Sequence, residues 1–300
     1  MNVFCSKMYK EDVMIKRTLI LIILLCTITT FLYSCINAAF SNDNFPDNAN
    51  DGGQTAETPE GSTTEETPGK EVEDAESGLI FTLLDNGTYS VRGMNQCIVD
   101  GKVVIPDTYN GKTVTVIETS AFNFYDNITE IVMPDSIISI ESVAFAGCTN
   151  LKTIRLSSNI SEIPVGCFAD CKSLETIALP DGLTKLCDSA FINCYRLTTL
   201  EIPKSVSVIE NYVFSGCLEL ENLIIPDGVT GIGIQCFYKC YSLREITIPA
   251  SVKGIGHKAF YAAELETVYY SGSEEQWKKI YIGDYNEELT SANIQYNGQK

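Results

Sequence analysis

Histidine and basic residues are the scarce components of this sequence, and their scarcity excludes several functions. The chain of 300 residues has one histidine, His257, which removes most general-base and zinc-site chemistry. Only 21 Lys and Arg stand against 39 Asp and Glu, a formal charge of −18. Nucleic acids and anionic lipid surfaces both require clustered cations. We therefore expect no nucleic-acid partner, no catalytic residue, no metal-binding residue and no cofactor.

Apolar residues are plentiful, so the chain as a whole is not disordered. They make up 45% of the sequence, and aromatic residues make up 10%, which is ample material for a core. Composition divides the chain into three segments, namely residues 1–35, 36–78 and 79–300.

Residues 1–35 are typical of a lipoprotein export signal. Lys16 and Arg17 precede an apolar stretch, residues 18–32, that is shorter than the ~20 residues a spanning helix needs. The stretch runs into Leu-Tyr-Ser-Cys at 32–35, which resembles a bacterial lipobox, although Tyr33 replaces the usual small or aliphatic residue. We predict that Cys35 is lipidated and anchors the protein to a membrane. An ordinary signal peptide and an uncleaved anchor are the alternatives.

Residues 36–78 are expected to form a disordered linker. Asp and Glu are interleaved there with Thr, Pro, Gly, Ser and Asn. Low hydrophobicity combined with like charge cannot bury enough surface to fold, and self-repulsion extends such a segment. The linker would hold the domain at 79–300 away from the membrane.

Residues 79–300 contain an internal repeat of 23 residues. Phenylalanine, proline and cysteine each recur at this period. Leu197–Pro203 (Leu-Thr-Thr-Leu-Glu-Ile-Pro) shows the pattern at the start of one unit. Alternating apolar residues in this pattern turn to one face, as a strand requires, and proline ends the strand. A fixed period of 20–29 residues with Leu-x-x-Leu-x-Leu spacing is typical of a leucine-rich repeat solenoid. The sequence predicts such a solenoid, β-rich with a parallel sheet between successive units.

The units resemble the BspA-like leucine-rich repeats of bacterial surface proteins over about 79–300. The ends depart from the repeat, as solenoid ends must. Residues 81–91 read as a hairpin with a tight turn at Asn86-Gly87, and the first unit carries an insertion at 109–111. Ser273–Gln276 reads as a capping box opening a short helix through Trp277. We expect an N-terminal hairpin cap and a short C-terminal helical cap.

Two apparent chemical motifs have a simpler structural interpretation. Cys167…Cys171 and Cys236…Cys240 have metal-like spacing, but Cys167 and Cys236 fall in a column otherwise filled by alanine. We expect the repeat cysteines to be buried free thiols, with disulfides as the alternative. Residues 254–259 match a dinucleotide-binding pattern, but no βαβ unit surrounds them, and Gly231 and Gly233 occupy the same column one repeat earlier. We expect all these glycines to be turn residues.

Function is therefore expected to come from a surface. The outward column that follows the predicted strands supplies the candidate binding face, which consists of Arg155, Glu201, Ile224, Thr247 and Tyr269. The resemblance implies a lipid-anchored, surface-exposed protein that binds protein or glycan macromolecules and mediates protein–protein or cell adhesion interactions. Its location would be extracytoplasmic. A structural scaffold of the cell envelope without a foreign ligand is the main alternative, and an enzyme is disfavoured because no column offers convergent acids.

Overall fold

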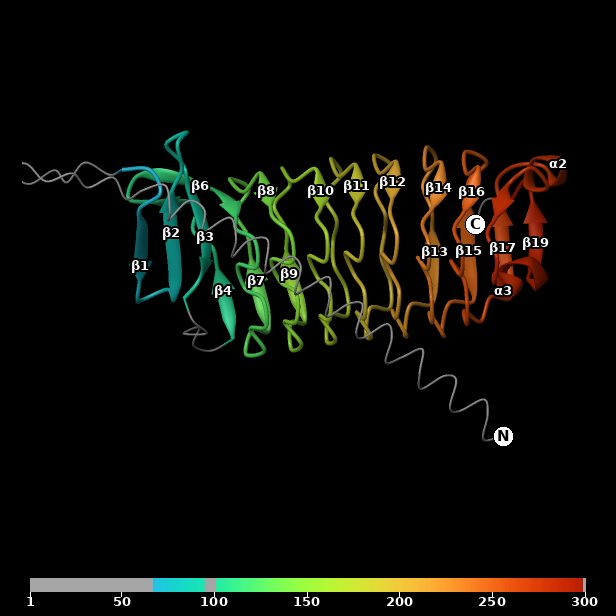
Figure 1. Ribbon diagram of the computed structural model, residues 1–300, viewed down its shortest axis with the longest axis horizontal. Helices are drawn as coiled ribbons and strands as arrows, with labels where there is room; N and C mark the ends of the chain where they lie inside the picture. Colours follow the sequence, from blue (N-terminus) through green and yellow to red (C-terminus); the bar gives the residue numbers. More distant parts are fainter. Residues whose placement is uncertain (1–66, 95–100, 299–300) are drawn as a thin grey trace, which may run out of the picture. The chain divides into compact units, whose positions relative to one another are not determined.

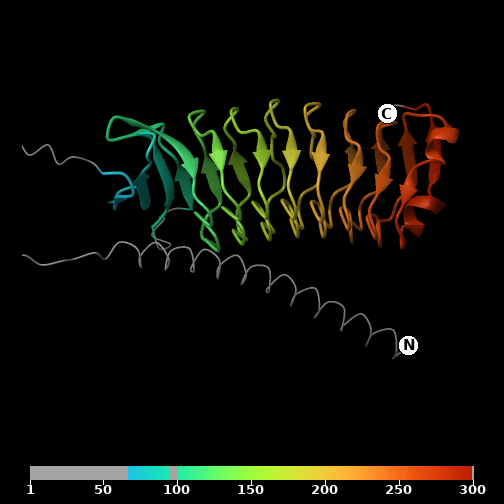
Figure 2. The same cartoon turned by 45° about the horizontal axis from the view of Figure 1, so that its top comes forward.

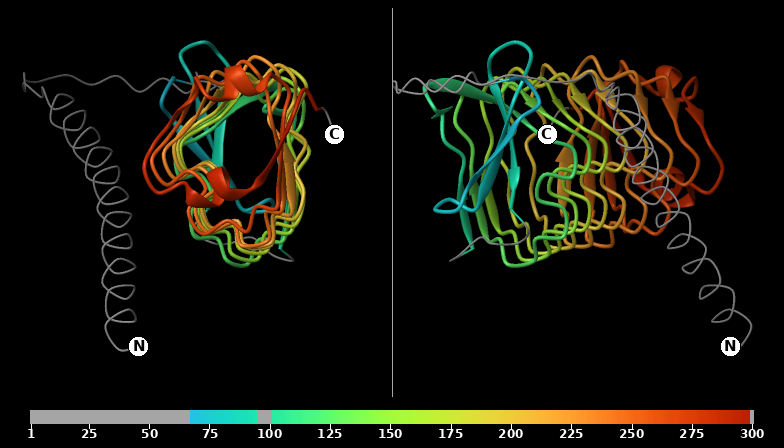
Figure 3. Two further views of the ribbon diagram at one scale, coloured as in Figure 1. Left: turned by 90° about the vertical axis from the view of Figure 1, so that its right-hand side faces the viewer. Right: turned by 60° about the vertical axis from the view of Figure 1, so that its left-hand side comes forward.

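Each 23-residue unit folds into one turn of a β-solenoid, because its apolar residues point inward from two strands joined by two corners. In one such turn, β7 (Glu130–Val132) leads through a corner at Pro134 to β8 (Ser139–Ile140). A second corner containing Phe145 closes the turn. The computed structural model describes residues 67–94 and 101–298, and the turns stack in chain order (Figures 1 and 2). Viewed along the stack, successive turns follow one closed outline (Figure 3).

Strands of successive turns form two parallel ladders. The first ladder contains the predicted Leu-x-x-Ile-x-Ile strands, in two pieces. One piece is β4 (Lys102–Val104), β7 and β9 (Thr153–Arg155); the other is β13 (Asn222–Ile224), β15 (Glu245–Ile248), β17 (Thr267–Tyr270) and β19 (Asn293–Tyr296). The second ladder is β10 (Glu162–Ile163), β11 (Lys185–Leu186), β12 (Val208–Ile209), β14 (Gly231–Ile232), β16 (Gly254–Ile255) and β18 (Tyr281–Ile282). The predicted parallel leucine-rich repeat solenoid is confirmed.

The N-terminal cap is larger than the predicted hairpin. Strands β2 (Leu79–Leu83) and β3 (Tyr89–Gly93) pair antiparallel, as expected. β1 (Glu71–Asp74) adds a further antiparallel strand, so the predicted linker boundary at residue 78 is wrong and folded structure starts earlier. Its acidic sequence suits an edge strand, where charge discourages further pairing. The predicted segment 1–35, with Cys35, and residues 36–66 lie outside the described residues.

The insertion of the first unit forms a second hairpin. β5 (Thr108–Tyr109) pairs antiparallel with β6 (Lys112–Ile117), which also pairs with β3 and β8 and so joins the cap to the solenoid. Tyr109 from this hairpin stacks on Phe81, with ring centroids 3.9 Å apart. The insertion therefore seals the end of the core.

The C-terminal cap contains two short helices, α2 (Glu274–Trp277) and α3 (Glu287–Ser291). Ser273 and Gln276 form the predicted capping box, each side chain bonding to the backbone N–H of the other residue. Trp277 packs edge-to-face on Tyr270, with ring centroids 5.1 Å apart. The predicted helical cap is confirmed, and its aromatic contact covers the last turn of the stack.

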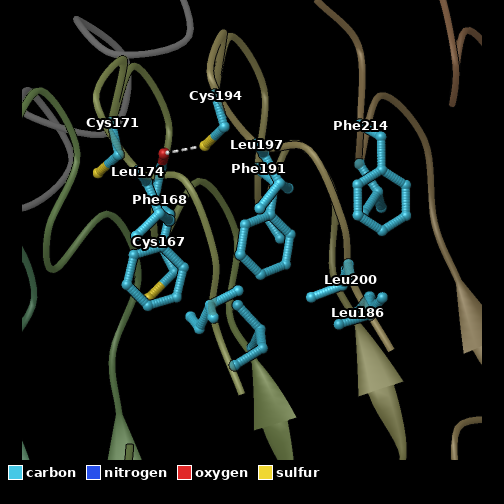
Figure 4. Close-up of a cluster of buried hydrophobic side chains, with 14 of the residues drawn as sticks. Cys167, Phe168, Cys171, Leu174, Leu186, Phe191, Cys194, Leu197, Leu200 and Phe214 are labelled. Carbon is cyan, nitrogen blue, oxygen red and sulfur yellow. Dashed lines mark hydrogen bonds between the residues drawn. The ribbon is translucent and has the colours of Figure 1, made fainter. Parts of the chain in front are cut away.

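A ladder of phenylalanines runs through the core, and Figure 4 shows three of them, Phe168, Phe191 and Phe214. Neighbouring rings stack nearly parallel, with centroids 5.1–5.8 Å apart and interplanar angles of 5–19°. All seven side chains are fully buried; they are Phe122, Phe145, Phe168, Phe191, Phe214, Phe237 and Phe260. The 23-residue period is thus a packing period, because each ring lies on the ring of the preceding turn.

Glycines in the second ladder permit close approach between turns. A Cβ on Gly233 would lie 2.2 Å from the carbonyl oxygen of Glu210 in the preceding turn, and one on Gly256 would lie 2.5 Å from the Ile234 nitrogen. Neither glycine has a positive φ. The expectation that these are turn residues is therefore wrong. Gly231 and Gly254 lie in strands, and positions 233 and 256 have no room for a side chain.

Replacing the central ring should be costly. Phe191→Ala removes two ring stacks and leaves a cavity, and we expect the free energy of unfolding to fall by about 3–5 kcal/mol. Urea unfolding followed by circular dichroism would measure this. The control is Tyr281→Ala, because Tyr281 is 73% exposed. This variant should change the free energy of unfolding by about 0.5 kcal/mol or less. Equal losses in the two variants would contradict a core built on the phenylalanine ladder.

A pair of glycine variants separates close approach from backbone flexibility. Gly233→Ala should destabilise the protein by about 1–3 kcal/mol, because the new methyl group meets a backbone oxygen that cannot move aside. Gly254→Ala, whose Cβ would have no neighbour within 4 Å, should be neutral or stabilising by up to about 1 kcal/mol. Thermal unfolding of both variants gives the comparison, and a Gly233→Ala protein as stable as the wild type would refute the packing argument.

Candidate functional site

The structure brings together three of the five predicted face residues. Glu201 and Ile224 are exposed, with Ile224 54% exposed, and both line a groove together with Thr247. Arg155 is exposed but lies outside the groove; it pairs with Asp135 at 3.3 Å and donates to the carbonyl oxygen of Met133. Tyr269 is half-buried beside Thr247 in the next strand, also outside the groove lining.

Thr247 is the one predicted face residue that solvent barely reaches. It is 8% exposed and lies in register between Ile224 and Tyr269, which flank it on the neighbouring strands. Its hydroxyl oxygen is shielded and has no hydrogen-bond partner among the described residues. Strand alternation still directs its side chain to the outward face, so Thr247 forms part of the groove floor.

The first ladder is interrupted next to this groove. The N–H groups of Ile105, Met133 and Ile225 each bond to the following turn, at 2.9–3.0 Å. The equivalent N–H groups of Leu156, Leu179 and Ile202 make no such bond within the described chain, and a single bridge, Thr176 to Thr199, is all that remains of the ladder there. In Figure 1, arrows β9 and β13 flank turns without arrows at this height. β13 therefore begins the second piece of the ladder, with the preceding turn beside it and joined by the bond from the Glu221 N–H to the Thr198 carbonyl oxygen.

The groove has a volume of about 1070 Å³ and follows the interruption. Its walls are the first-ladder segments of three turns and the corners that follow them. The lining residues are Asp181, Thr199–Ser205, Asn222–Asp227, Thr247, Pro249 and Ser271. A surface groove of this size can accept an extended chain segment better than a flat sheet could.

Carboxylates dominate the charge of the groove. Asp181, Glu201 and Asp227 line it, against one cation, Lys204. None of the four makes an ion pair with any part of the chain that the structure describes. The groove therefore carries excess negative charge that the fold itself does not neutralise.

Sequence analysis missed the two aspartates of the groove. Asp181 and Asp227 each follow the proline that ends a strand, a column that also contains Asp135 and Lys204. The outward column considered above contains strand residues alone, so the corner column was not considered. The shared 23-residue period with Glu201 and Ile224 was the available signal.

The cysteines belong to the core and form no reactive site. All eight cysteines in the described residues are buried and free, as predicted. Five of them donate an S–H hydrogen bond to the phenylalanine carbonyl of the preceding turn, at 3.1–3.3 Å (Figure 4); they are Cys148, Cys171, Cys194, Cys217 and Cys240. Burial raises the pKa of Cys148 to about 12 and the pKa of Cys187 to about 11.

Other chemistry is sparse in the described part of the chain. No group of His, Cys, Asp and Glu within residues 67–94 and 101–298 is placed to hold a metal ion. His257 is half-buried and packs edge-to-face on Tyr285, with ring centroids 5.2 Å apart. None of the helices in these residues is long and apolar enough to cross a membrane. The groove remains the feature best suited to binding.

The fold and groove define a leucine-rich repeat solenoid with an extended outward face, the class of repeat protein that generally serves as an interaction scaffold. The chain belongs to the family described as BspA type leucine rich repeat region, which matches residues 102–221 and 207–299 in six copies. This match begins after the N-terminal hairpin. No curated protein matches the chain.

Solved structures share the architecture. A leucine-rich repeat protein of T. pallidum is 26% identical with a TM-score of 0.57, covering 64% of this chain and 89% of its own. A leucine-rich repeat protein of Bacteroides ovatus is 20% identical with a TM-score of 0.54, covering 79% of this chain and 72% of its own. The similarity to the second protein concerns the fold alone.

The buried thiols should make stability fall at alkaline pH. In the native state they keep their protons, whereas the unfolded state releases them above its pKa near 9, so the free energy of unfolding decreases as pH rises from 9 towards 12. Each such thiol contributes a slope of about 1.4 kcal/mol per pH unit. Denaturant unfolding at about pH 8.5, 9.5 and 10.5 would measure it.

The matched control is Cys171→Ala/Cys194→Ala, since alanine already fills this column in the last turn as Ala263. This variant has two buried thiols fewer, so its free energy of unfolding should fall less steeply with pH. The tyrosines and lysines are unchanged, so their titration contributes equally in both proteins. A slope unchanged in this variant would contradict the role of the thiols.

Proposed function

We propose that the protein is a lipid-anchored, surface-exposed binding protein that engages a macromolecular partner through the outward face of its first ladder. The groove at Glu201, Ile224 and Thr247 carries this proposal, because it is a large concave feature on the face that repeat proteins use for partners. Partner binding of this kind mediates protein–protein or cell adhesion interactions.

The anchor is proposed from the sequence. The basic residues, the short apolar stretch and the Leu-Tyr-Ser-Cys sequence ending at Cys35 support export and lipidation. The acidic residues that follow support a tether, since like charges keep such a segment extended. Together they support a domain displayed outside the cytoplasm and held to a membrane by the lipid on Cys35.

Protease shaving of intact cells tests the location. The solenoid, followed by antibody, should disappear from wild-type cells because it is exposed at the surface. Cys35→Ala should release the protein into the medium, because the lipid acceptor is gone. Opening the cells before protease treatment controls for intrinsic resistance, and a cytoplasmic marker controls for lysis.

The same experiment identifies the alternative. Protection of the solenoid until the envelope is opened would overturn surface exposure and favour a scaffold inside the envelope. Retention of the Cys35→Ala protein with the membrane would overturn the lipid anchor and leave an uncleaved apolar anchor in its place.

A further inference from the structure

We propose that the groove binds an extended, cationic peptide segment of a partner protein, with lysine or arginine side chains on the groove carboxylates and an apolar side chain on Ile224. This inference rests on the proposed function and specifies the chemistry of the partner. It follows from three independent features of the groove: unneutralised charge, an exposed isoleucine and a buried hydroxyl without a partner.

The groove runs across the turns. Its lining comes from neighbouring turns of the stack, from Thr199–Ser205 through Asn222–Asp227 to Thr247. An extended segment laid across the turns can contact these residues in order, because a repeat protein presents equivalent outward positions side by side.

The charge of the groove selects a cationic chain. Asp181, Glu201 and Asp227 outnumber Lys204, and the fold neutralises none of them. These carboxylates come from three successive turns, so they form a row of separate charges. They are not grouped closely enough to hold a metal ion. A row of this kind complements side-chain cations spaced along a peptide.

Ile224 and Thr247 form the part of the groove that can contact an apolar or hydroxyl-bearing side chain of the peptide. Ile224 is 54% exposed, which is costly in water and favourable once covered. Beside it in register, the hydroxyl of Thr247 is buried without a partner. A buried polar group without a hydrogen bond costs about 1–3 kcal/mol, and a bound chain that bonds to it recovers this energy. In the chain, Ile224 lies between Glu201 and Asp227, and Thr247 lies on the following strand.

Peptide binding to the purified full chain in mild non-ionic detergent tests the proposal. The probes are two fluorescein-labelled decapeptides, one of alternating lysine and valine and the other of alternating glutamate and valine. Fluorescence anisotropy should show saturable binding of the lysine peptide only, weakened by added salt.

Matched variants place the binding in the groove. Glu201→Gln/Asp227→Asn should weaken binding of the lysine peptide about tenfold, since two attractive charges are lost. Asp126→Asn/Glu219→Gln removes the same charge from exposed positions outside the groove and should leave binding within about twofold. Ile224→Ser should weaken binding without changing its dependence on salt. Circular dichroism confirms that each variant is folded.

Several results would overturn the proposal. Equal weakening in the two double variants would mean that the peptide responds only to the net charge of −18. Equal binding of the glutamate peptide, or displacement of the lysine peptide by dextran, would identify a different ligand class. The lysine peptide could fail to bind while Glu201→Gln/Asp227→Asn still reduces the attachment of intact cells to a surface. That result would overturn the cationic-peptide proposal and leave the proposed function in place. Loss of surface exposure overturns the function itself.

Discussion

The whole structure depends on one constraint, which is that a single turn cannot bury its own apolar residues. Each turn exposes a ring, a thiol and several aliphatic side chains to its neighbours, and only stacking removes them from water. The phenylalanine ladder shows this directly, since each ring uses both faces on adjacent turns. The cysteine column adds a hydrogen bond between turns, from Cys194 to the carbonyl oxygen of Phe168. Period, core and cap requirements all follow from this dependence on neighbours.

Stacking fixes the inward columns and leaves the outward ones free to vary. The positions of Val132, Arg155, Glu201, Ile224 and Thr247 are equivalent in the repeat but carry five different side chains. The same freedom extends to the ladder bonds, which the core does not require at every turn. Where Leu156, Leu179 and Ile202 lose these bonds, their side chains still pack inside, because the corners and the second ladder keep the turns together. A groove can therefore open on one face without loss of the core.

Features that repeat were readable from the sequence, and features that occur once were not. The inward columns, the hairpin at Asn86-Gly87 and the capping box at Ser273 each carry a local or periodic pattern. β1 was missed because its charges resemble those of a linker, and only pairing with β2 makes it a strand. The burial of Thr247 depends on the neighbours Ile224 and Tyr269, which strand alternation alone does not weigh. The glycine at 233 was misread because its cause is a carbonyl oxygen in another turn.

The contrast between the two halves of the first ladder explains why the groove is the place for a partner. In the N-terminal half the outward charges are paired, with Lys102 on Glu130 at 2.8 Å and Arg155 on Asp135. Exposed pairs of this kind add only about 0–1 kcal/mol to stability, so the fold loses little where they are missing. At Glu201 and Asp227 they are missing, and both side chains line the groove. The same positions that the fold can leave unsatisfied are those that a bound chain can satisfy, and this makes binding there favourable at small cost to stability.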